Sequence, residues 1–115
     1  MKRIQPIIIA LVIVLTAPGF QIIKTSLGIT VRDEVGNIVT GATIQLFETE
    51  EDYNLEQNVA AEGKTDDKGY FRFKEVKAIS YFVIVRKDDK DNSGGGERTG
   101  KLEEKRINRV TVVIQ

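Results

Sequence analysis

The chain has 115 residues, enough for one domain, and its 17 basic and 17 acidic side chains leave no net charge. A balanced charge argues against a nucleic-acid partner, which needs a concentrated basic face. The chain contains no Cys and no His, so disulfides, thiolate metal sites and a Cys nucleophile are excluded, and the commonest general base is missing. We therefore expect a protein that is not an enzyme and holds no cofactor, because triad chemistry and zinc hydrolysis lack their residues.

Residues 1–19 have the pattern of a secretory signal peptide. A positive start is followed by an uninterrupted apolar run over residues 7–15 and by small residues at Ala17 and Gly19. We expect cleavage after Gly19 and a periplasmic or secreted mature protein. The alternative is a retained membrane anchor formed by residues 4–17, although the apolar run is shorter than the ~20 residues of a spanning helix.

After a linker over residues 20–26, the segment 27–115 is predicted to form one all-β domain. Short stretches of alternating apolar and polar residues are separated by turn-forming residues, which is typical of a two-sheet antiparallel β-sandwich of about seven strands. The expected strands span residues 27–32, 42–47, 59–65, 70–74, 80–87 and 106–115. The expected core includes Ile29, Val31, Ile44, Leu46, Phe71, Phe73, Val83, Val85 and Val112.

Three details of strand pairing follow from the pattern. The turn residues 66–69 predict a hairpin between the strands on either side. Residues 80–87 carry apolar side chains on both faces, which indicates a central strand. In the last strand, Ile107 shares a face with Val112 only if a bulge interrupts the strand at residues 108–109.

Residues 48–58 are acidic and polar, and we expect a loop there, although a single helical turn around Tyr53 is an alternative. Loops of a rigid sandwich are common places for binding. The candidate contacts with a partner are Glu50, Glu51, Asp52 and Tyr53. The tyrosine is included because Tyr is favoured at protein interfaces.

Residues 88–100 contain three consecutive glycines and many charges, and we expect a mobile loop. Within it, residues 89–94 match the first six positions of a calcium-binding EF-hand loop, but the twelfth position is Gly100 rather than Glu and no helix flanks the segment. We expect no metal site there. The alternative is a calcium site formed by Asp89, Asp91, Ser93 and Glu97.

Two short motifs lie in the order found in a known family. The stretch 29–46, with Gly36 and Gly41-Ala42, and the stretch 65–73 resemble the signatures of carboxypeptidase regulatory-like domains, and residues 81–85 resemble their next strand. The resemblance implies a transthyretin-like (prealbumin-like) sandwich and an accessory role beside a catalytic or transport unit.

Two functions therefore remain open. The first is an exported accessory domain that binds another protein of the cell envelope, and the second is a carbohydrate-binding module. An exposed aromatic row on one sheet face would favour the second, and a mixed, charged face would favour the first.

Overall fold

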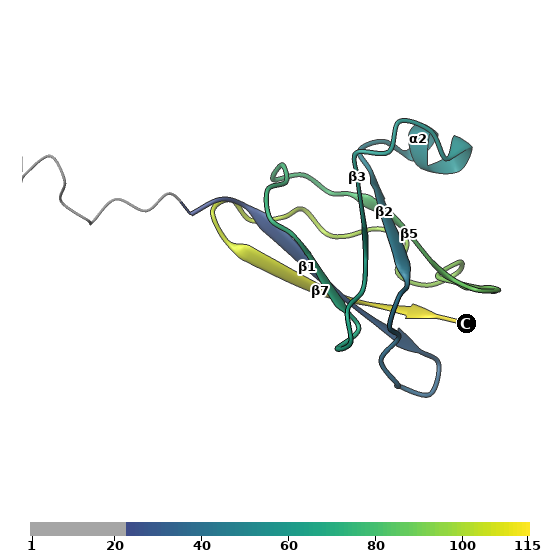
Figure 1. Ribbon diagram of the computed structural model, residues 1–115. Coiled ribbons are helices and arrows are strands. Elements are labelled where there is room, and N and C mark those ends of the chain that lie inside the picture. Colours follow the sequence, from purple (N-terminus) through teal and green to yellow (C-terminus); the bar gives the residue numbers. More distant parts are fainter. Residues whose placement is uncertain (1–22) are drawn as a thin grey trace, which may run out of the picture.

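The computed structural model describes residues 23–115. The expected signal peptide, its cleavage site and the alternative anchor over residues 4–17 lie outside the described residues. In the described part of the chain seven strands form two packed sheets, and one short helix lies against one of them (Figure 1). They are β1 Ser26–Asp33, β2 Thr43–Phe47, α2 Glu50–Leu55, β3 Ala61–Lys64, β4 Tyr70–Phe73, β5 Phe82–Lys87, β6 Lys90–Asp91 and β7 Ile107–Ile114.

The strand order is β4-β1-β7 in one sheet and β3-β2-β5-β6 in the other. The predicted all-β sandwich is thus confirmed, and β5 lies inside its sheet as expected of residues 80–87. One pair departs from the expected antiparallel arrangement, because β7 runs parallel to β1 along its whole length. A parallel neighbour needs a long connection, and here the whole second sheet lies between the two strands in sequence.

The core lies between the sheets and follows the alternation seen in the sequence. In β1, Leu27, Ile29 and Val31 are fully buried, and the intervening side chains point to the outer face of the sheet. Eight of the nine core residues expected above are buried, and the ninth, Phe71, is half-buried and packs against the cluster. The faces of the strands were therefore assigned correctly.

The turn at residues 66–69 forms, but the hairpin predicted around it is wrong. The Asp66 carboxylate accepts hydrogen bonds from the backbone N–H groups of Lys68 (2.8 Å) and Tyr70 (3.1 Å). The strands on either side, however, belong to different sheets, since β3 pairs with β2 and β4 pairs with β1. A turn determines a local reversal, whereas burial of Phe73 between the sheets decides which neighbour β4 takes.

Residues 108–109 form no bulge, so the condition under which Ile107 would share a face with Val112 is not met. The pairing of β7 with β1 is continuous from Ser26↔Ile107 to Asp33↔Ile114. Val112 and Ile114 therefore face the core, while Ile107 lies on the outer face with 42% of its surface exposed. An isolated apolar residue at the end of a strand is tolerated in contact with water.

Candidate functional site

Residues 48–58 contain a helix where a loop was expected. The Thr49 side chain caps α2 by accepting a hydrogen bond from the Asp52 N–H (3.1 Å), and acidic residues occupy the first turn, where they favour the helix dipole. At the other end Glu56 adopts a left-handed conformation with φ of 50°. The Asp52 carboxylate accepts hydrogen bonds from the side-chain amides of Asn58 and Gln57, and these hydrogen bonds lower the pKa of Asp52.

The helix docks on the outer face of the β2–β5 pair through one aromatic side chain. The Tyr53 ring lies 6.2 Å from the ring of Phe47 and 5.5 Å from that of Phe82, measured between centroids. Phe47 is fully buried and Ile84 nearly so, although both belong to the outer face of the sheet. Apolar residues at outward-facing positions, together with a Thr-Glu-Glu-Asp start, are the sequence signal from which α2 could have been predicted.

Residues 88–100 are mostly loop, as expected, but the two-residue strand β6 and several hydrogen bonds attach them to the edge of the second sheet. β6 pairs with the end of β5. The buried Asn92 side chain then accepts from the Val85 N–H (3.0 Å) and donates to the Val83 carbonyl (2.9 Å). Further along, the Thr99 side chain accepts from the Tyr81 N–H (2.9 Å). These contacts cover the edge of β5 from Tyr81 to Lys87, which glycine content alone did not reveal.

One hydrogen bond joins these two segments. The Tyr53 hydroxyl donates to a Glu97 carboxylate oxygen over 2.5 Å, and both side chains are partly buried. The pKa of Tyr53 is raised to about 12, mainly by burial of the phenol and secondly by its hydrogen bond to Glu97. The helix, β5 and residues 88–100 thus form one continuous surface, which we call the α2 face.

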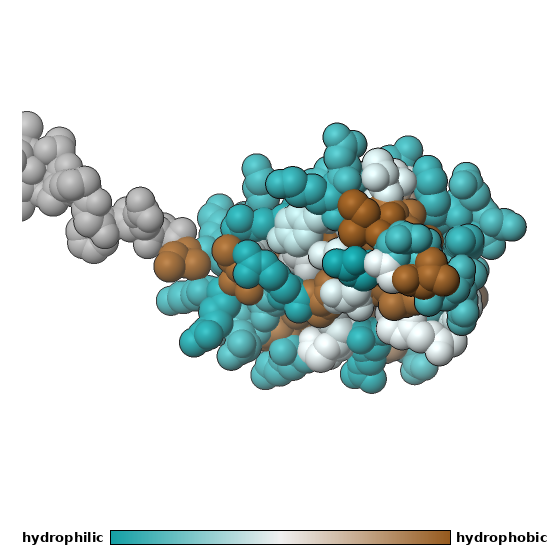
Figure 2. All heavy atoms as spheres, turned by 90° about the horizontal axis from the view of Figure 1, so that it is seen from below, coloured by the Kyte–Doolittle hydropathy of each residue, from teal (hydrophilic) through white to brown (hydrophobic). Residues whose placement is uncertain are grey.

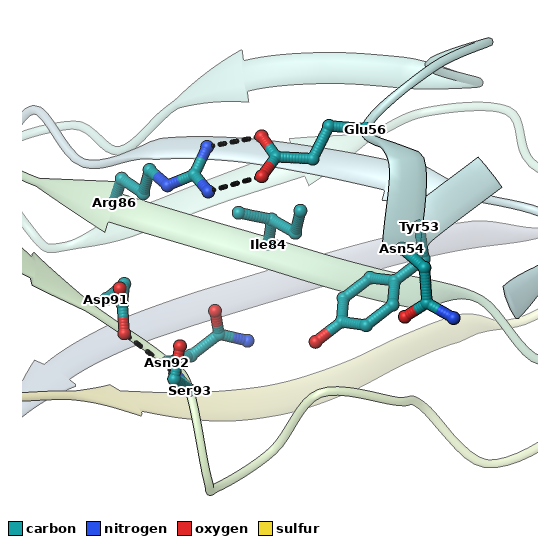
Figure 3. Close-up of a pocket in the computed structure, with 8 residues that line it drawn as sticks. All are labelled: Tyr53, Asn54, Glu56, Ile84, Arg86, Asp91, Asn92 and Ser93. Atoms are coloured by element: carbon teal, nitrogen blue, oxygen red, sulfur yellow. Dashed lines mark hydrogen bonds and ion pairs between the residues drawn. The ribbon is translucent and has the colours of Figure 1, made fainter. Parts of the chain in front are cut away.

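A polar depression of about 180 Å³ lies on the α2 face (Figure 3). On one side Arg86 and Glu56 form a bidentate ion pair, with N···O distances of 2.7 and 2.8 Å. The hydrogen bonds from Arg86 lower the pKa of Glu56. On the other side Asp91 accepts from the Ser93 N–H, which lowers the pKa of Asp91. Pockets for small ligands usually exceed ~300 Å³ and are mostly apolar, so this depression suits a side chain of a partner better.

The structure brings the candidate calcium ligands only partly together. Asp91 and Ser93 line the depression on the α2 face, but Asp89 lines a different depression between Asp33 and Lys87. Glu97 is bonded to Tyr53. Within residues 23–115 no group of three or more acidic, His or Cys side chains is arranged to hold a metal ion.

The candidate partner contacts occupy distinct positions on α2. Glu50 and Glu51 are exposed, whereas Asp52 and Tyr53 are half-buried and hold the helix in place. Leu55 is also exposed, at 62%. Of the four candidate contacts, Glu50 and Glu51 are therefore free to contact a partner. Leu55 is a further exposed residue of α2, and it was missed because an isolated Leu in a polar stretch carries no sequence signal.

Comparisons with known proteins support the fold. No protein-family model matches the chain, and no curated protein matches its sequence. Among solved structures, the group B streptococcus pilus 2b backbone protein is similar with a TM-score of 0.52 at 18% identity, over 79% of this chain and 40% of that one. Chlorocatechol 1,2-dioxygenase from Pseudomonas putida is similar with a TM-score of 0.45 at 20% identity, over 79% and 60% of the two chains.

The likeness to the pilus protein confirms the sandwich. The chain spans less than two thirds of both structures, and their identities are too low to transfer an activity. The resemblance to carboxypeptidase regulatory-like domains therefore stays a prediction. The described part of the chain has one helix, the six-residue α2, and it is too short to cross a membrane.

Proposed function

We propose that this chain is an exported, non-catalytic accessory domain that binds another protein of the cell envelope through the α2 face. The observation that carries the proposal is the Tyr53–Glu97 hydrogen bond, which joins two polar segments into one surface. A preformed surface loses less conformational entropy on binding than two independent loops. It can therefore bind a partner without weakening the sandwich beneath it.

The chemistry of the α2 face indicates a basic partner. Glu50 and Glu51 project from α2 without an ion-pair partner among residues 23–115, and Leu55 lies one turn away. An apolar side chain beside unpaired acidic ones suits a protein surface with complementary charge. Exposed charges act through the encounter rate and are screened by salt, so we expect weak, salt-sensitive association.

The surface favours a protein over a polysaccharide. In residues 23–115 no aromatic side chain is exposed, and Tyr53, Tyr70 and Tyr81 are half-buried or buried. A row of exposed aromatic rings, the feature expected of a sugar platform, is therefore not found in the described residues. Figure 2 shows the side of the domain away from α2, where hydrophobic patches lie among hydrophilic side chains.

Export and the lack of catalysis belong to the same proposal. Export is supported by the pattern of residues 1–19, and N-terminal sequencing of the protein from the envelope fraction tests it, with Phe20 expected as the first residue. Recovery of intact Met1 in the membrane fraction would contradict cleavage and favour the anchor. The lack of catalysis is supported by the missing Cys and His residues.

Variants at exposed acids test the role of the α2 face. The double variant Glu50→Gln/Glu51→Gln removes two charges and leaves the structural Asp52 and Tyr53 in place. In pull-downs from envelope extract at low salt, we expect this variant to lose a partner that the unmodified chain retains, and we expect high salt to have the same effect.

The matched control is Glu103→Gln/Glu104→Gln, which removes two adjacent, exposed charges outside the α2 face. It should keep the partner. Equal recovery by all three proteins at both salt concentrations would show that the α2 face is not used. Retention of the purified domain on insoluble polysaccharide would replace the proposal by the carbohydrate-binding alternative.

A further inference from the structure

The outer face of the β4-β1-β7 sheet is basic and separate from the α2 face. Directly paired residues point to the same side of a sheet, so the register identifies which side chains share this face. They are Ser26, Gly28, Thr30 and Arg32 from β1, Tyr70 and Arg72 from β4, and Ile107, Arg109, Thr111 and Val113 from β7. The face thus carries three arginines and no carboxylate, although the chain as a whole is neutral.

Two of the arginines lie in one row across the sheet. Gly28 pairs with Arg72 on one side and with Arg109 on the other, so their Cα atoms are two strand spacings apart, or ~10 Å. Both side chains are exposed. Among residues 23–115, neither of them takes part in an ion pair within 4.0 Å.

The hydroxyl of Tyr70 occupies the space between them. A Cβ atom at Gly28 would collide with the Tyr70 hydroxyl and with the adjacent part of its ring, so the ring lies directly over this glycine. The hydroxyl has no hydrogen-bond partner among the described residues. Gly28 thereby allows a phenol donor to lie in the same row as two guanidinium groups, which a residue with a side chain would prevent.

We propose that Arg72, Arg109 and Tyr70 form a binding site for a phosphate group. Guanidinium groups donate paired hydrogen bonds to phosphate and carboxylate oxygens. One guanidinium already engages both oxygens of a carboxylate, whereas a phosphate offers further oxygens, in a tetrahedral arrangement, to a second guanidinium and a hydroxyl. Because Arg72 and Arg109 are both exposed, they can reach the phosphate of a larger molecule, either a lipid headgroup or a soluble phosphate ester.

The third arginine of the face is not part of the site. Arg32 pairs with Val113, two rows away from Gly28, and its Nη1 donates to the Gly36 carbonyl over 2.8 Å. Its guanidinium is thus held by the turn after β1. It contributes positive charge that attracts an anion but does not share the contacts of the row at Gly28.

Titration with inorganic phosphate, followed by nuclear magnetic resonance of the backbone amides and arginine Nε–Hε groups, tests the proposal. We expect saturable shifts centred on Gly28, Arg72 and Arg109. The variant Arg72→Gln/Arg109→Gln should raise the apparent dissociation constant for phosphate about tenfold or more, as for loss of charge-assisted hydrogen bonds. Tyr70→Phe should raise the dissociation constant by a smaller factor, because only one neutral hydrogen-bond donor is lost.

The control Lys64→Gln/Lys101→Gln removes the same charge from exposed positions outside this sheet face and should leave the dissociation constant unchanged. Acetate at equal ionic strength should give no saturable shift. Equal responses to acetate and phosphate, or equal responses of both double variants, would overturn the assignment.

Sedimentation with phosphatidylcholine vesicles, with and without phosphatidylglycerol, distinguishes the two sources of phosphate. Binding that needs phosphatidylglycerol and is lost in Arg72→Gln/Arg109→Gln supports a lipid headgroup. Saturable shifts with inorganic phosphate and no vesicle binding support a soluble phosphate ester. Neither vesicle binding nor saturable shifts would show that the row at Gly28 is only a solvated part of the sheet.

Discussion

Tyr53 and Glu97 lie 44 positions apart in the sequence, yet the hydroxyl of one donates a hydrogen bond to the carboxylate of the other over 2.5 Å. This contact joins the helix after β2 to the segment that covers the edge of β5. It is thus a direct side-chain link between the two segments that carry most of the irregular structure in the described part of the chain.

Tyr53→Phe keeps the aromatic packing on Phe47 and Phe82 and removes only the hydroxyl. We expect a loss of about 1–2 kcal/mol in the free energy of unfolding, because the hydrogen bond has a charged acceptor but is partly open to water. Hydrogen exchange should rise in residues 88–100 and in α2 together. Unchanged exchange in residues 88–100 would show that the two segments are independent.

Ionisation of Tyr53 should be delayed in the folded protein. Burial and the hydrogen bond to Glu97 raise its pKa to about 12 from an ordinary value of 10.0. The raised pKa means that the folded state favours the protonated phenol, so this contribution to stability is present below pH 10 and is lost as pH rises towards 12. Ultraviolet titration of the unmodified protein should show tyrosinate formation near pH 12 that is absent in Tyr53→Phe.

Asn92→Ala should destabilise the domain by about 2–4 kcal/mol, since it leaves the buried Val85 N–H and Val83 carbonyl without their partner. Chemical denaturation provides the measurement. The control Asn54→Ala changes the same residue type at an exposed position on α2 and should stay within about 0.5 kcal/mol. Similar values for the two variants would mean that Asn92 does not hold the edge of β5.

Phe73→Ala should cost about 3–5 kcal/mol, as expected when a large aromatic side chain is removed from a packed core. Phe73 is 6% exposed, and its ring lies 4.8 Å from the ring of Phe71. Thermal and denaturant unfolding would both report the change. A cost below about 1 kcal/mol is the result that would place Phe73 in contact with solvent.

Ser26→Ala should be neutral or stabilising, by up to about 1 kcal/mol. The Ser26 hydroxyl is buried and has no hydrogen-bond partner among residues 23–115, so its removal relieves a desolvation cost and leaves little empty volume. Measurement of the unfolding midpoint decides the sign. A clear loss of stability would indicate that the hydroxyl is paired in solution.

The sequence by itself determined the class of fold and most of the core, because alternation along a strand is a local property. Leu27, Ile29 and Val31 occupy every second position of the sequence, and because successive side chains of a strand point to opposite faces, all three are buried in the structure. The turn at Asp66 was equally local, since its hydrogen bonds lie within four residues.

The tertiary structure alone decided the features that depend on distant contacts. The sheet to which β4 belongs, the docking of α2 through Tyr53 and the contact of residues 88–100 with α2 all rest on pairs far apart in the chain. The three glycines of residues 88–100 do lie in a loop, but local composition gave no sign that the buried Asn92 holds this loop to the sheet. Such contacts form only when the sheets pack, so no local pattern records them.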